Sequence, residues 1–362
     1  MVIEKVEKLR CMPRLLMMGI STSIIGILPP AASAGVGVVI VLQLMRLAQC
    51  FGRGGTWGGG ILMAYENVPE NKRSFYAAIP QIGLPIGFGL SSILIAVPTL
   101  LLPEDIFFTW GWRIPFLAAI ILTVIVIRQK GEMMETEDYK KAQAKLEAEE
   151  AEGKKHKVGF IPMVKGYWKT LLLGCGTRWV DGTFYNIFIV WILSYCINWL
   201  GMPLIQTYII TIIACIFKIP FTLFGGWCAQ KLGNTRTFVI GALASAVLSI
   251  PTLKVIELSK GNLAITIIGI VLGWSIAYNL IWAVISSLWS SYFETEVRYS
   301  GISFVYHVPS FLVAGMVPTI CTLLINYGKG DTIYVGIYST VVALISAACA
   351  LALKVRHDRG EK

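Results

Sequence analysis

The chain has 362 residues, of which 56% are hydrophobic and 14% are charged, and its mean hydropathy is +0.69. Soluble domains carry about 25% charged and 45–50% apolar residues, so this composition excludes a water-soluble core. The formal charge of +10 comes from basic residues spread over the loops, which does not indicate a nucleic-acid partner. The sequence predicts an all-α polytopic membrane protein that has the lipid bilayer as its surroundings.

Ten apolar segments are long enough to be transmembrane helices. A hydrocarbon core of about 30 Å requires about 20 mostly apolar residues per helix, and helices satisfy their own backbone groups in lipid. The predicted spans are 15–33, 36–63, 75–101, 108–127, 170–196, 206–228, 237–256, 263–289, 299–325 and 331–353. The first is the weakest, because Arg14 and Pro29 confine its apolar stretch.

The basic residues of the loops predict the orientation. With the N-terminus in the cytoplasm, the inner segments carry 23 of the 31 basic residues and the outer segments carry four. We therefore expect a plasma-membrane protein with both termini in the cytoplasm. A cleaved signal peptide ending at Ala32-Ser-Ala34 is an alternative for the N-terminus, and it would leave nine spans.

A polar stretch after the fourth span predicts the domain organisation. It contains helix-forming residues with opposite charges three or four apart, which is typical of a solvated helix. We expect a four-span partial bundle over 1–128, a partly helical cytoplasmic linker over 129–165 and a six-span bundle over 166–362. The eight cysteines show no metal-ligand spacing, so we expect neither a metal site nor a cofactor.

Seven short motifs occur in one order along the chain. They are Ile25-Gly-Ile-Leu-Pro29, Arg46-Leu-Ala-Gln49, the glycine run 52–60, Glu66-Asn-Val-Pro69 with Arg73, Trp110-Gly-Trp-Arg-Ile-Pro-Phe-Leu117, Gly226-Trp-Cys-Ala-Gln-Lys-Leu-Gly233 and Phe293-Glu-Thr-Glu-Val-Arg-Tyr-Ser-Gly301. Together they resemble the major facilitator superfamily, and in particular its metabolite:proton symporter family. The resemblance covers residues 12–355 and implies a two-bundle fold that works by alternating access.

The sequence departs from this family in identifiable places. Family members have twelve spans, and this sequence begins at the position of their third. Thr56 stands where the family has Glu, Gln230 replaces an Asp, and Ser291 and Glu294 replace a Glu and a Pro. Several of these changes remove acidic groups that the resemblance associates with coupling or gating, so the resemblance implies neither proton coupling through the family's usual residues nor, by itself, transport.

Charged residues within the first-half spans are candidates for substrate binding, because a charge in lipid must face protein or water. Arg46 and Arg53 are seven residues apart and share a helix face, with Gln49 one turn from Arg46. Guanidinium groups match carboxylates, so these residues can form the anion-facing wall of a cavity. The resemblance favours Arg46. Structural ion pairs with acids on neighbouring helices remain an alternative. The glycine run beside them is typical of close helix packing.

The first span of the second half carries Arg178 and Asp181 on one face, continued by Tyr185. A carboxylate beside a guanidinium can exchange that partner for a proton or a substrate, so Asp181 and Arg178 are candidates for proton coupling. A permanent ion pair is an equally good interpretation. Lys218, which precedes Pro220 in a later span, is expected to extend to the membrane interface; a position over the cavity, at a bent segment, is the alternative.

Polar residues recur on two further spans. Tyr278, Asn279 and Trp282 belong to a polar stripe with helical spacing and are candidates for substrate binding, together with Tyr185. His307 can relay protons, although a structural histidine between helices is the commoner case. At the cytoplasmic ends of the spans, Glu66, Arg73 and Arg298 are candidates for gating.

The charges within the spans predict the function. Four basic residues and one acid would attract anions, so we expect a monomeric secondary transporter of a small organic anion, coupled to protons, and not an enzyme. The alternative is a transport-incompetent homologue that acts as a folded membrane subunit or scaffold.

Overall fold

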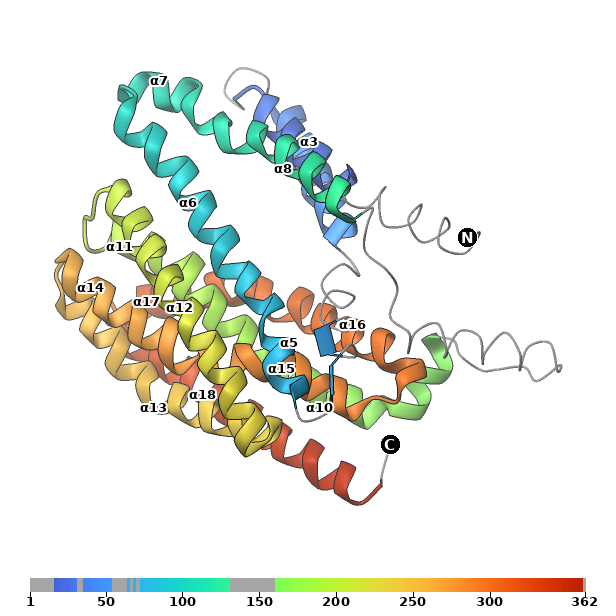
Figure 1. Ribbon diagram of the computed structural model, residues 1–362. Coiled ribbons are helices and arrows are strands. Elements are labelled where there is room, and N and C mark those ends of the chain that lie inside the picture. The colour runs from blue at the N-terminus through green and yellow to red at the C-terminus, as the bar shows by residue number, and fades with distance from the viewer. Residues whose placement is uncertain are drawn as a thin grey trace. The chain divides into compact units, whose positions relative to one another are not determined.

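The computed structural model describes residues 16–30, 35–53, 64–65, 68–69, 72–130 and 160–360. Within these residues the regular structure is helical and contains no strand (Figure 1). Seven helical segments are long and apolar enough to cross a membrane, and three shorter apolar helices cover Leu16–Ile27, Val36–Cys50 and Gly111–Val126. These segments correspond to the ten predicted spans, and the all-α polytopic class is confirmed.

The chain forms two compact units, which are described separately. The first comprises residues 1–60 and 91–140, and the second comprises 61–90 and 141–362. The helices of the first unit are Leu16–Ile27, α3 (Val36–Arg53), the later part of α6 (Gly83–Leu101), α7 (Glu104–Thr109), η3 (Gly111–Arg113) and α8 (Ile114–Lys130). The predicted linker falls mainly outside the described residues.

The second unit contains the remaining helices. They are α5 (Arg73–Ala78), η2 (Pro80–Ile82), the start of α6, α10 (Phe160–Tyr185), η4 (Asn186–Trp191), α11 (Ile192–Asn198), α12 (Leu204–Leu232), α13 (Asn234–Leu258), α14 (Leu263–Ile270), η5 (Val271–Ala277), α15 (Asn279–Tyr292), α16 (Thr295–Leu312), η6 (Ala314–Met316), α17 (Val317–Tyr327) and α18 (Ile333–Asp358). The π-helical segments η4 and η5 each interrupt a long span: η5 lies near the middle of Leu263–Ser290, and η4 lies in the C-terminal half of Met163–Asn198.

The Trp-Arg-Ile-Pro motif has a structural role in the first unit. Arg113 donates from one guanidinium nitrogen to the carbonyl of Gly26 at 2.9 Å and to that of Leu28 at 2.7 Å. These carbonyls lie at the C-terminal end of the helix Leu16–Ile27, where backbone acceptors lack intrahelical partners. The guanidinium also lies 4.7 Å from the Trp112 ring. The motif therefore fixes the start of α8 to the end of this helix.

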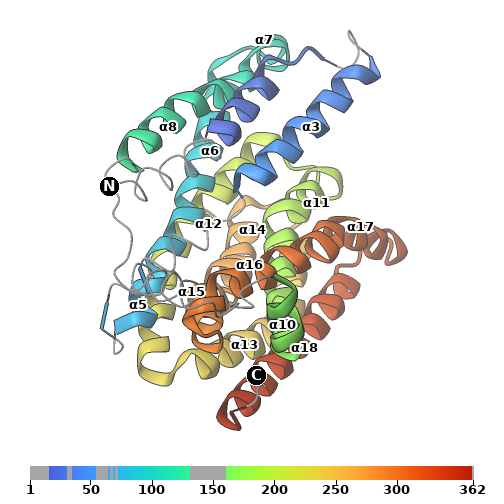
Figure 2. The same ribbon diagram turned by 90° about the vertical axis from the view of Figure 1, so that its right-hand side faces the viewer.

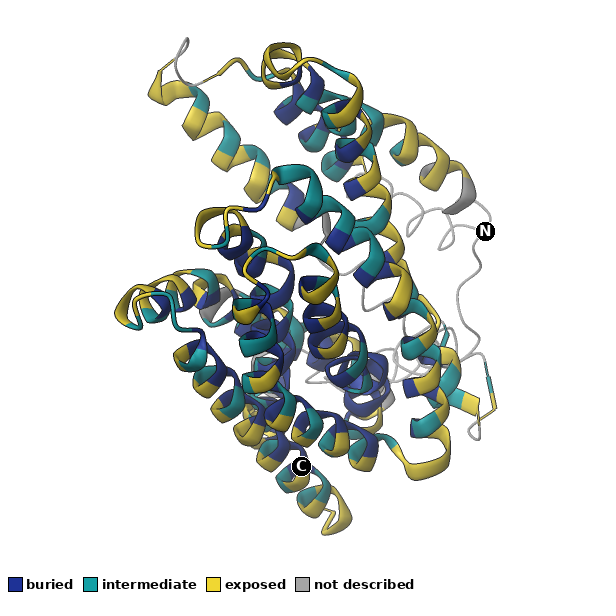
Figure 3. Ribbon diagram, turned by 90° about the vertical axis from the view of Figure 1, so that its left-hand side faces the viewer, coloured by how far each residue is buried: buried dark blue, intermediate teal, exposed yellow. Residues whose placement is uncertain are grey.

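Close helix packing defines the core of the second unit. Helix α10 packs against α16 and α18, and α13 packs against α15 and α18 (Figure 2). Helix α5 packs against α12 and α15, although it comes early in the sequence. Buried residues occupy the facing sides of the helices and exposed apolar residues the opposite sides (Figure 3). This is the expected distribution for helices whose outer faces contact lipid.

A glycine pair allows α12 to approach two neighbours. A Cβ atom on Gly225 would lie 2.7 Å from the Ala283 Cβ, and one on Gly226 would lie 2.7 Å from the Ala78 Cβ. Replacing Gly226 with valine is therefore expected to destabilise the protein by about 1–3 kcal/mol through overpacking. The thermal unfolding midpoint of the purified protein in detergent measures this effect. The matched variant Gly166→Val, at a glycine with open space around it, should change the midpoint less, and equal shifts would contradict the packing argument.

Charged residues join helices at the end of the second unit where α13 ends and α18 begins. Lys254 contacts Asp331 at 2.7 Å and Glu257 at 3.0 Å. The second carboxylate oxygen of Glu257 also accepts from the Thr332 backbone N–H at 2.8 Å, at the N-terminus of α18. The hydrogen bond from Lys254 holds the pKa of Asp331 below its usual value. This network supplies a hydrogen-bond acceptor for a backbone N–H at the start of α18, and its charged groups lie at the ends of the helices.

Candidate functional site

An ion pair lies buried in the centre of the second unit. Arg178 and Asp181 are one turn apart on α10, and the guanidinium contacts one carboxylate oxygen. The Tyr278 hydroxyl donates to the other carboxylate oxygen from the neighbouring span. Asp181 is 1% exposed and Arg178 is 7% exposed. The structure thus brings together three of the predicted residues, two from the coupling set and one from the binding set.

The Arg178 guanidinium also contacts α16. One terminal nitrogen donates to the Ser310 hydroxyl at 3.2 Å, and the guanidinium carbon lies 4.4 Å from the Tyr306 ring centroid. The Arg178 Nε–H has no acceptor among the residues that the structure describes. Buried N–H groups nearly always have a hydrogen-bond acceptor. Since this donor has none among those residues, a bound ligand can supply the acceptor.

Lys218 lies beside this ion pair and is completely buried. Its ammonium nitrogen is 4.3 Å from the ring centroids of both Trp274 and Tyr278, and 3.5 Å from the Trp274 carbonyl oxygen. The expectation that Lys218 extends to the interface is therefore wrong. It stands at the middle of α12 (Leu204–Leu232), about 21 Å from either end at 1.5 Å per residue, which is beyond the reach of its side chain.

Tyr278 joins the lysine to the ion pair. Its ring forms one side of the aromatic pair that encloses the Lys218 ammonium, while its hydroxyl contacts Asp181. Phe184 stacks on this ring, with centroids 6.1 Å apart and an interplanar angle of 9°. We call Arg178, Asp181, Lys218, Trp274 and Tyr278 the central cluster.

The π-helical segments position the aromatic residues of the central cluster. Trp274 lies within η5, and Tyr278 follows it directly. A π-helical turn adds a residue to the helix and commonly occurs at functional sites. The Phe188 ring of η4 packs against Gly273, where a Cβ atom would lie 2.6 Å from a ring carbon. The glycine therefore lets the two irregular segments approach each other.

The polar stripe of α15 forms helix contacts. Asn279 donates to the Lys218 carbonyl at 2.8 Å and shares a hydrogen bond with the Thr222 hydroxyl. Trp282 donates from its indole to the Gln81 carbonyl at 3.1 Å, and the Gln81 amide donates back to the Trp282 carbonyl at 3.4 Å. The predicted residues Asn279 and Trp282 therefore fix α15 against α12 and η2. Tyr185, at the end of α10, packs its ring edge-to-face with Phe88 at 5.7 Å.

Two of the predicted gating residues meet at one aromatic ring. The Arg73 guanidinium carbon is 5.4 Å from the Tyr65 ring centroid, and that of Arg298 is 5.8 Å from the same centroid. Arg298 also donates to the Phe293 carbonyl at 3.2 Å. Glu66 lies outside the described residues. His307 is exposed on α16, and its ring packs edge-to-face against Tyr306 at 5.2 Å.

The predicted binding residues of the first unit lie on α3. Arg46 is exposed, and Gln49 is buried and donates to the Thr22 hydroxyl at 2.7 Å. Gln49 therefore has a partner on the helix Leu16–Ile27. Arg53 is the last residue of α3, and its side chain lies outside the described part of the chain.

Sequence reasoning missed several participants in this region. They are Thr222, Trp274, Tyr306, Ser310 and Gln81, and Lys218 was assigned to the wrong environment. A signal for Lys218 was present, because a lysine at the centre of an apolar span cannot extend to water. No comparable signal marked Trp274, since a tryptophan in a span is ordinarily an apolar packing residue.

Comparison with known proteins places the chain in a family. The model of the Major Facilitator Superfamily matches residues 10–318. An inner membrane metabolite transport protein of Escherichia coli is 31% identical, over 95% of this chain and 77% of that protein. The shikimate transporter of Escherichia coli is 30% identical, over 93% of this chain and 76% of its own length. The proline/betaine transporter of Salmonella typhimurium is 27% identical, over 95% of this chain and 68% of its own length.

The fold agrees with solved structures. A proton:xylose symporter matches with a TM-score of 0.71 at 15% identity, covering 96% of this chain and 78% of that chain. A fucose:proton symporter of Escherichia coli matches with a TM-score of 0.60 at 12% identity. With the family model over most of its length and relatives at 30% identity or more, the chain belongs to the major facilitator superfamily.

Proposed function

We propose that this protein transports a small organic anion by alternating access, together with protons, and that the central cluster is its substrate and coupling site. The observation that carries this proposal is the presence of two buried basic side chains, Arg178 and Lys218, around a single carboxylate: Asp181 pairs with Arg178 directly, and the Tyr278 side chain lies between Asp181 and Lys218. Neither cation can be hydrated at this depth, so a bound carboxylate would stabilise both. The excess of basic groups therefore selects for an anion.

The position of the central cluster supports this assignment. Asp181, Lys218 and Tyr278 each stand near the middle of a membrane-spanning segment, namely Met163–Asn198, Leu204–Leu232 and Leu263–Ser290. Secondary transporters bind substrate and coupling ion near the bilayer midplane, at interrupted helices. The cluster is flanked by two such interruptions, η4 and η5.

Two buried donors give a substrate hydrogen-bonding partners. The Arg178 Nε–H and the Trp274 indole N–H are both buried and have no acceptor within the described ranges. An anion with at least two acceptor oxygens can satisfy such donors, and a carboxylate has this geometry. Shikimate, named for one relative, is a carboxylate.

Asp181 is proposed as the proton site. Its carboxylate contacts the guanidinium of Arg178 and the hydroxyl of Tyr278, and the Tyr278 ring in turn lies against the ammonium of Lys218. When a substrate carboxylate binds the cations, Asp181 loses attractive charge, and its protonated form becomes more favourable. Substrate binding and proton uptake would thus favour each other.

The other predicted residues keep secondary roles in this proposal. Tyr185, Asn279 and Trp282 would shape the wall of the site in the second unit. Arg46, Gln49 and Arg53 stay candidates for substrate binding within the first unit. Arg73, Arg298 and Glu66 would close the cytoplasmic side. His307 would exchange protons between Asp181 and water.

A transport-incompetent membrane subunit is the second candidate function. The observation that favours it is the closed Arg178–Asp181 pair, which is buried and hydrogen-bonded on both carboxylate oxygens. A permanent ion pair of this kind would fix α10 against α15 without exchanging partners.

Uptake into proteoliposomes separates the two candidates. Purified protein is reconstituted and tested with radiolabelled organic acids, zwitterions and neutral sugars, with and without an inward proton gradient. The proposal predicts uptake of at least one organic acid, stimulated by the gradient and abolished by a protonophore. Equal uptake in protein-free liposomes for every compound would support the subunit instead.

A further inference from the structure

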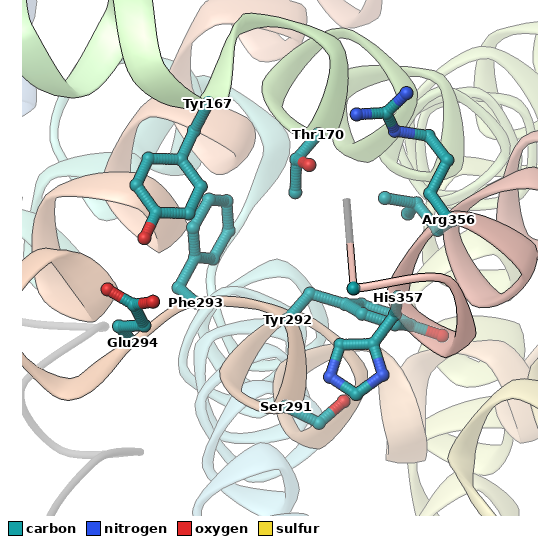
Figure 4. A pocket seen from close by; sticks show the side chains of 10 residues that line it. Tyr167, Thr170, Ser291, Tyr292, Phe293, Glu294, Arg356 and His357 are labelled. Carbon is teal, nitrogen blue, oxygen red and sulfur yellow. The ribbon is translucent and has the colours of Figure 1, made fainter. Parts of the chain in front are cut away.

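A cavity opens at one end of the second unit, away from the central cluster. It has a volume of about 260 Å³ and lies where α10 begins and where α15 and α18 end. Figure 4 shows Thr170 and Arg356 on one side of this cavity and Tyr167 and Glu294 on the other, with His357 and Tyr292 near one another. Helices α10 and α18 pack together beside it.

Side-chain contacts hold the walls of the cavity in place. Helix α10 bends at Tyr167, which has φ −118° and ψ 20°, and the Tyr167 ring packs against Phe293 at 6.0 Å. The Tyr292 hydroxyl shares a hydrogen bond with Thr235 at 2.7 Å, and its ring lies edge-to-face with His357 at 5.3 Å. Burial raises the pKa of Tyr292, so its hydroxyl remains protonated. The walls therefore come from three helices that are joined by side-chain contacts.

The surroundings of the cavity are basic. Besides Arg356 and His357, the end of α18 carries Lys354, Arg359 and one acid, Asp358, and the first turns of α10 carry Lys165 and Lys169. Some of this charge follows from the general preference for cations at helix C-termini and on the cytoplasmic side. That preference does not explain why Arg356 and His357 both line the cavity.

A tryptophan indicates the depth of the cavity in the membrane. Trp168 is 54% exposed and lies between the cavity-lining residues Tyr167 and Thr170 in the sequence. The Lys169 ammonium lies 5.5 Å from its ring centroid. An exposed tryptophan beside a lysine at the end of a span is typical of the headgroup region of a bilayer. The cavity therefore opens at the level of lipid phosphates.

We propose that this cavity binds the headgroup of a phospholipid, with Arg356 and His357 holding the phosphate and Glu294 accepting a hydrogen bond from the headgroup. Basic pockets between membrane helices on the cytoplasmic side are suited to such headgroups. The acid on the far wall selects headgroups that carry hydrogen-bond donors, such as glycerol or ethanolamine, over choline. This inference concerns the membrane and does not depend on the proposed substrate.

Thermal unfolding of the purified full-length protein in detergent tests the proposal, with short-chain phosphatidylglycerol, phosphatidylethanolamine, phosphatidylcholine or inorganic phosphate added separately. A ligand that binds the folded state raises the unfolding midpoint, by about 3 °C or more near saturation. We expect this shift with phosphatidylglycerol or phosphatidylethanolamine, and less than half of it with phosphatidylcholine. A full shift with inorganic phosphate alone would overturn the lipid assignment in favour of a free-phosphate site.

Variants assign the shift to the cavity. The double variant Arg356→Gln/His357→Gln should lose more than half of the shift in the unfolding midpoint. The single variant His357→Gln should lose a smaller part of it, and because this side chain is exposed, its replacement should not disturb folding. The matched variant Lys260→Gln/Lys329→Gln removes two cations near the opposite ends of α13 and α18 and should keep the full shift. Equal shifts in the wild type and in both cavity variants would overturn the proposal.

Discussion

Replacing Asp181 with asparagine is expected to abolish uptake driven by a proton gradient. The amide keeps the shape of the side chain but cannot bind a proton, so substrate movement loses its coupling. The same change leaves the Arg178 guanidinium buried without a counter-charge, which costs about 3–5 kcal/mol of stability. Uptake in proteoliposomes and the unfolding midpoint in detergent measure the two effects separately.

A second variant distinguishes coupling from folding. In Arg178→Gln/Asp181→Asn both charges are removed, so the midpoint should recover while gradient-driven uptake stays absent. The matched variant Asp331→Asn, at an exposed carboxylate beside Lys254, should keep full coupling. Gradient-driven uptake in the Asp181→Asn protein at the wild-type rate would exclude Asp181 as the proton site.

Replacing Lys218 with methionine is expected to raise stability and to remove anion uptake. Methionine has a similar length and fills the space between Trp274 and Tyr278 without a charge. Exchanging buried ionic groups for apolar ones of similar volume often stabilises a protein, by about 1–4 kcal/mol. The loss of one cation from the central cluster removes the charge that an anionic substrate requires. The unfolding midpoint and the initial rate of uptake should therefore change in opposite directions.

Lys231→Met is the matched control for this variant. Lys231 stands on the same helix, and its ammonium lies 4.2 Å from the ring of Trp227, but it is exposed. Its replacement should change neither the midpoint nor uptake appreciably, because a surface cation–π pair contributes little. If Lys218→Met destabilised the protein and left uptake unchanged, Lys218 would be a packing residue and the substrate site would lie elsewhere.

The membrane-spanning architecture could be predicted because it depends on local composition. Seven of the ten predicted segments coincide with apolar helices that are long enough to cross a bilayer, and the other three coincide with shorter apolar helices. Arg178 and Asp181 were also predictable as neighbours, since residues three apart on a helix share a face. The sequence does not indicate whether Arg178 and Asp181 exchange each other for a substrate or a proton, because such an exchange involves two different states of the protein.

The environment of Lys218 and the role of Trp274 depend on contacts between distant segments. The aromatic pair around the lysine comes from η5 and the residue after it, 56–60 positions later in the sequence. The π-helical turn that places Trp274 has no distinctive residue pattern, because its sequence, VLGWSIA, is that of an ordinary apolar helix. Similarly, α5 packs against α12 and α15, which hydropathy along the chain does not indicate.

The central cluster suggests an order of events for transport. A substrate carboxylate that reaches Arg178 and Lys218 competes with Asp181 for their positive charge. Asp181 then accepts a proton, and the neutral carboxyl group no longer requires the guanidinium. Release of substrate on the other side restores the ion pair and discharges the proton.

Substrate-dependent proton movement tests this account most directly. Proteoliposomes loaded with a pH-sensitive dye are given an organic acid that the uptake screen identifies, with no imposed gradient. The account predicts acidification of the interior with the wild-type protein and none with Asp181→Asn, while exchange of labelled for unlabelled substrate continues in the variant. Uptake by the wild type without acidification, or unchanged acidification in the variant, would contradict it.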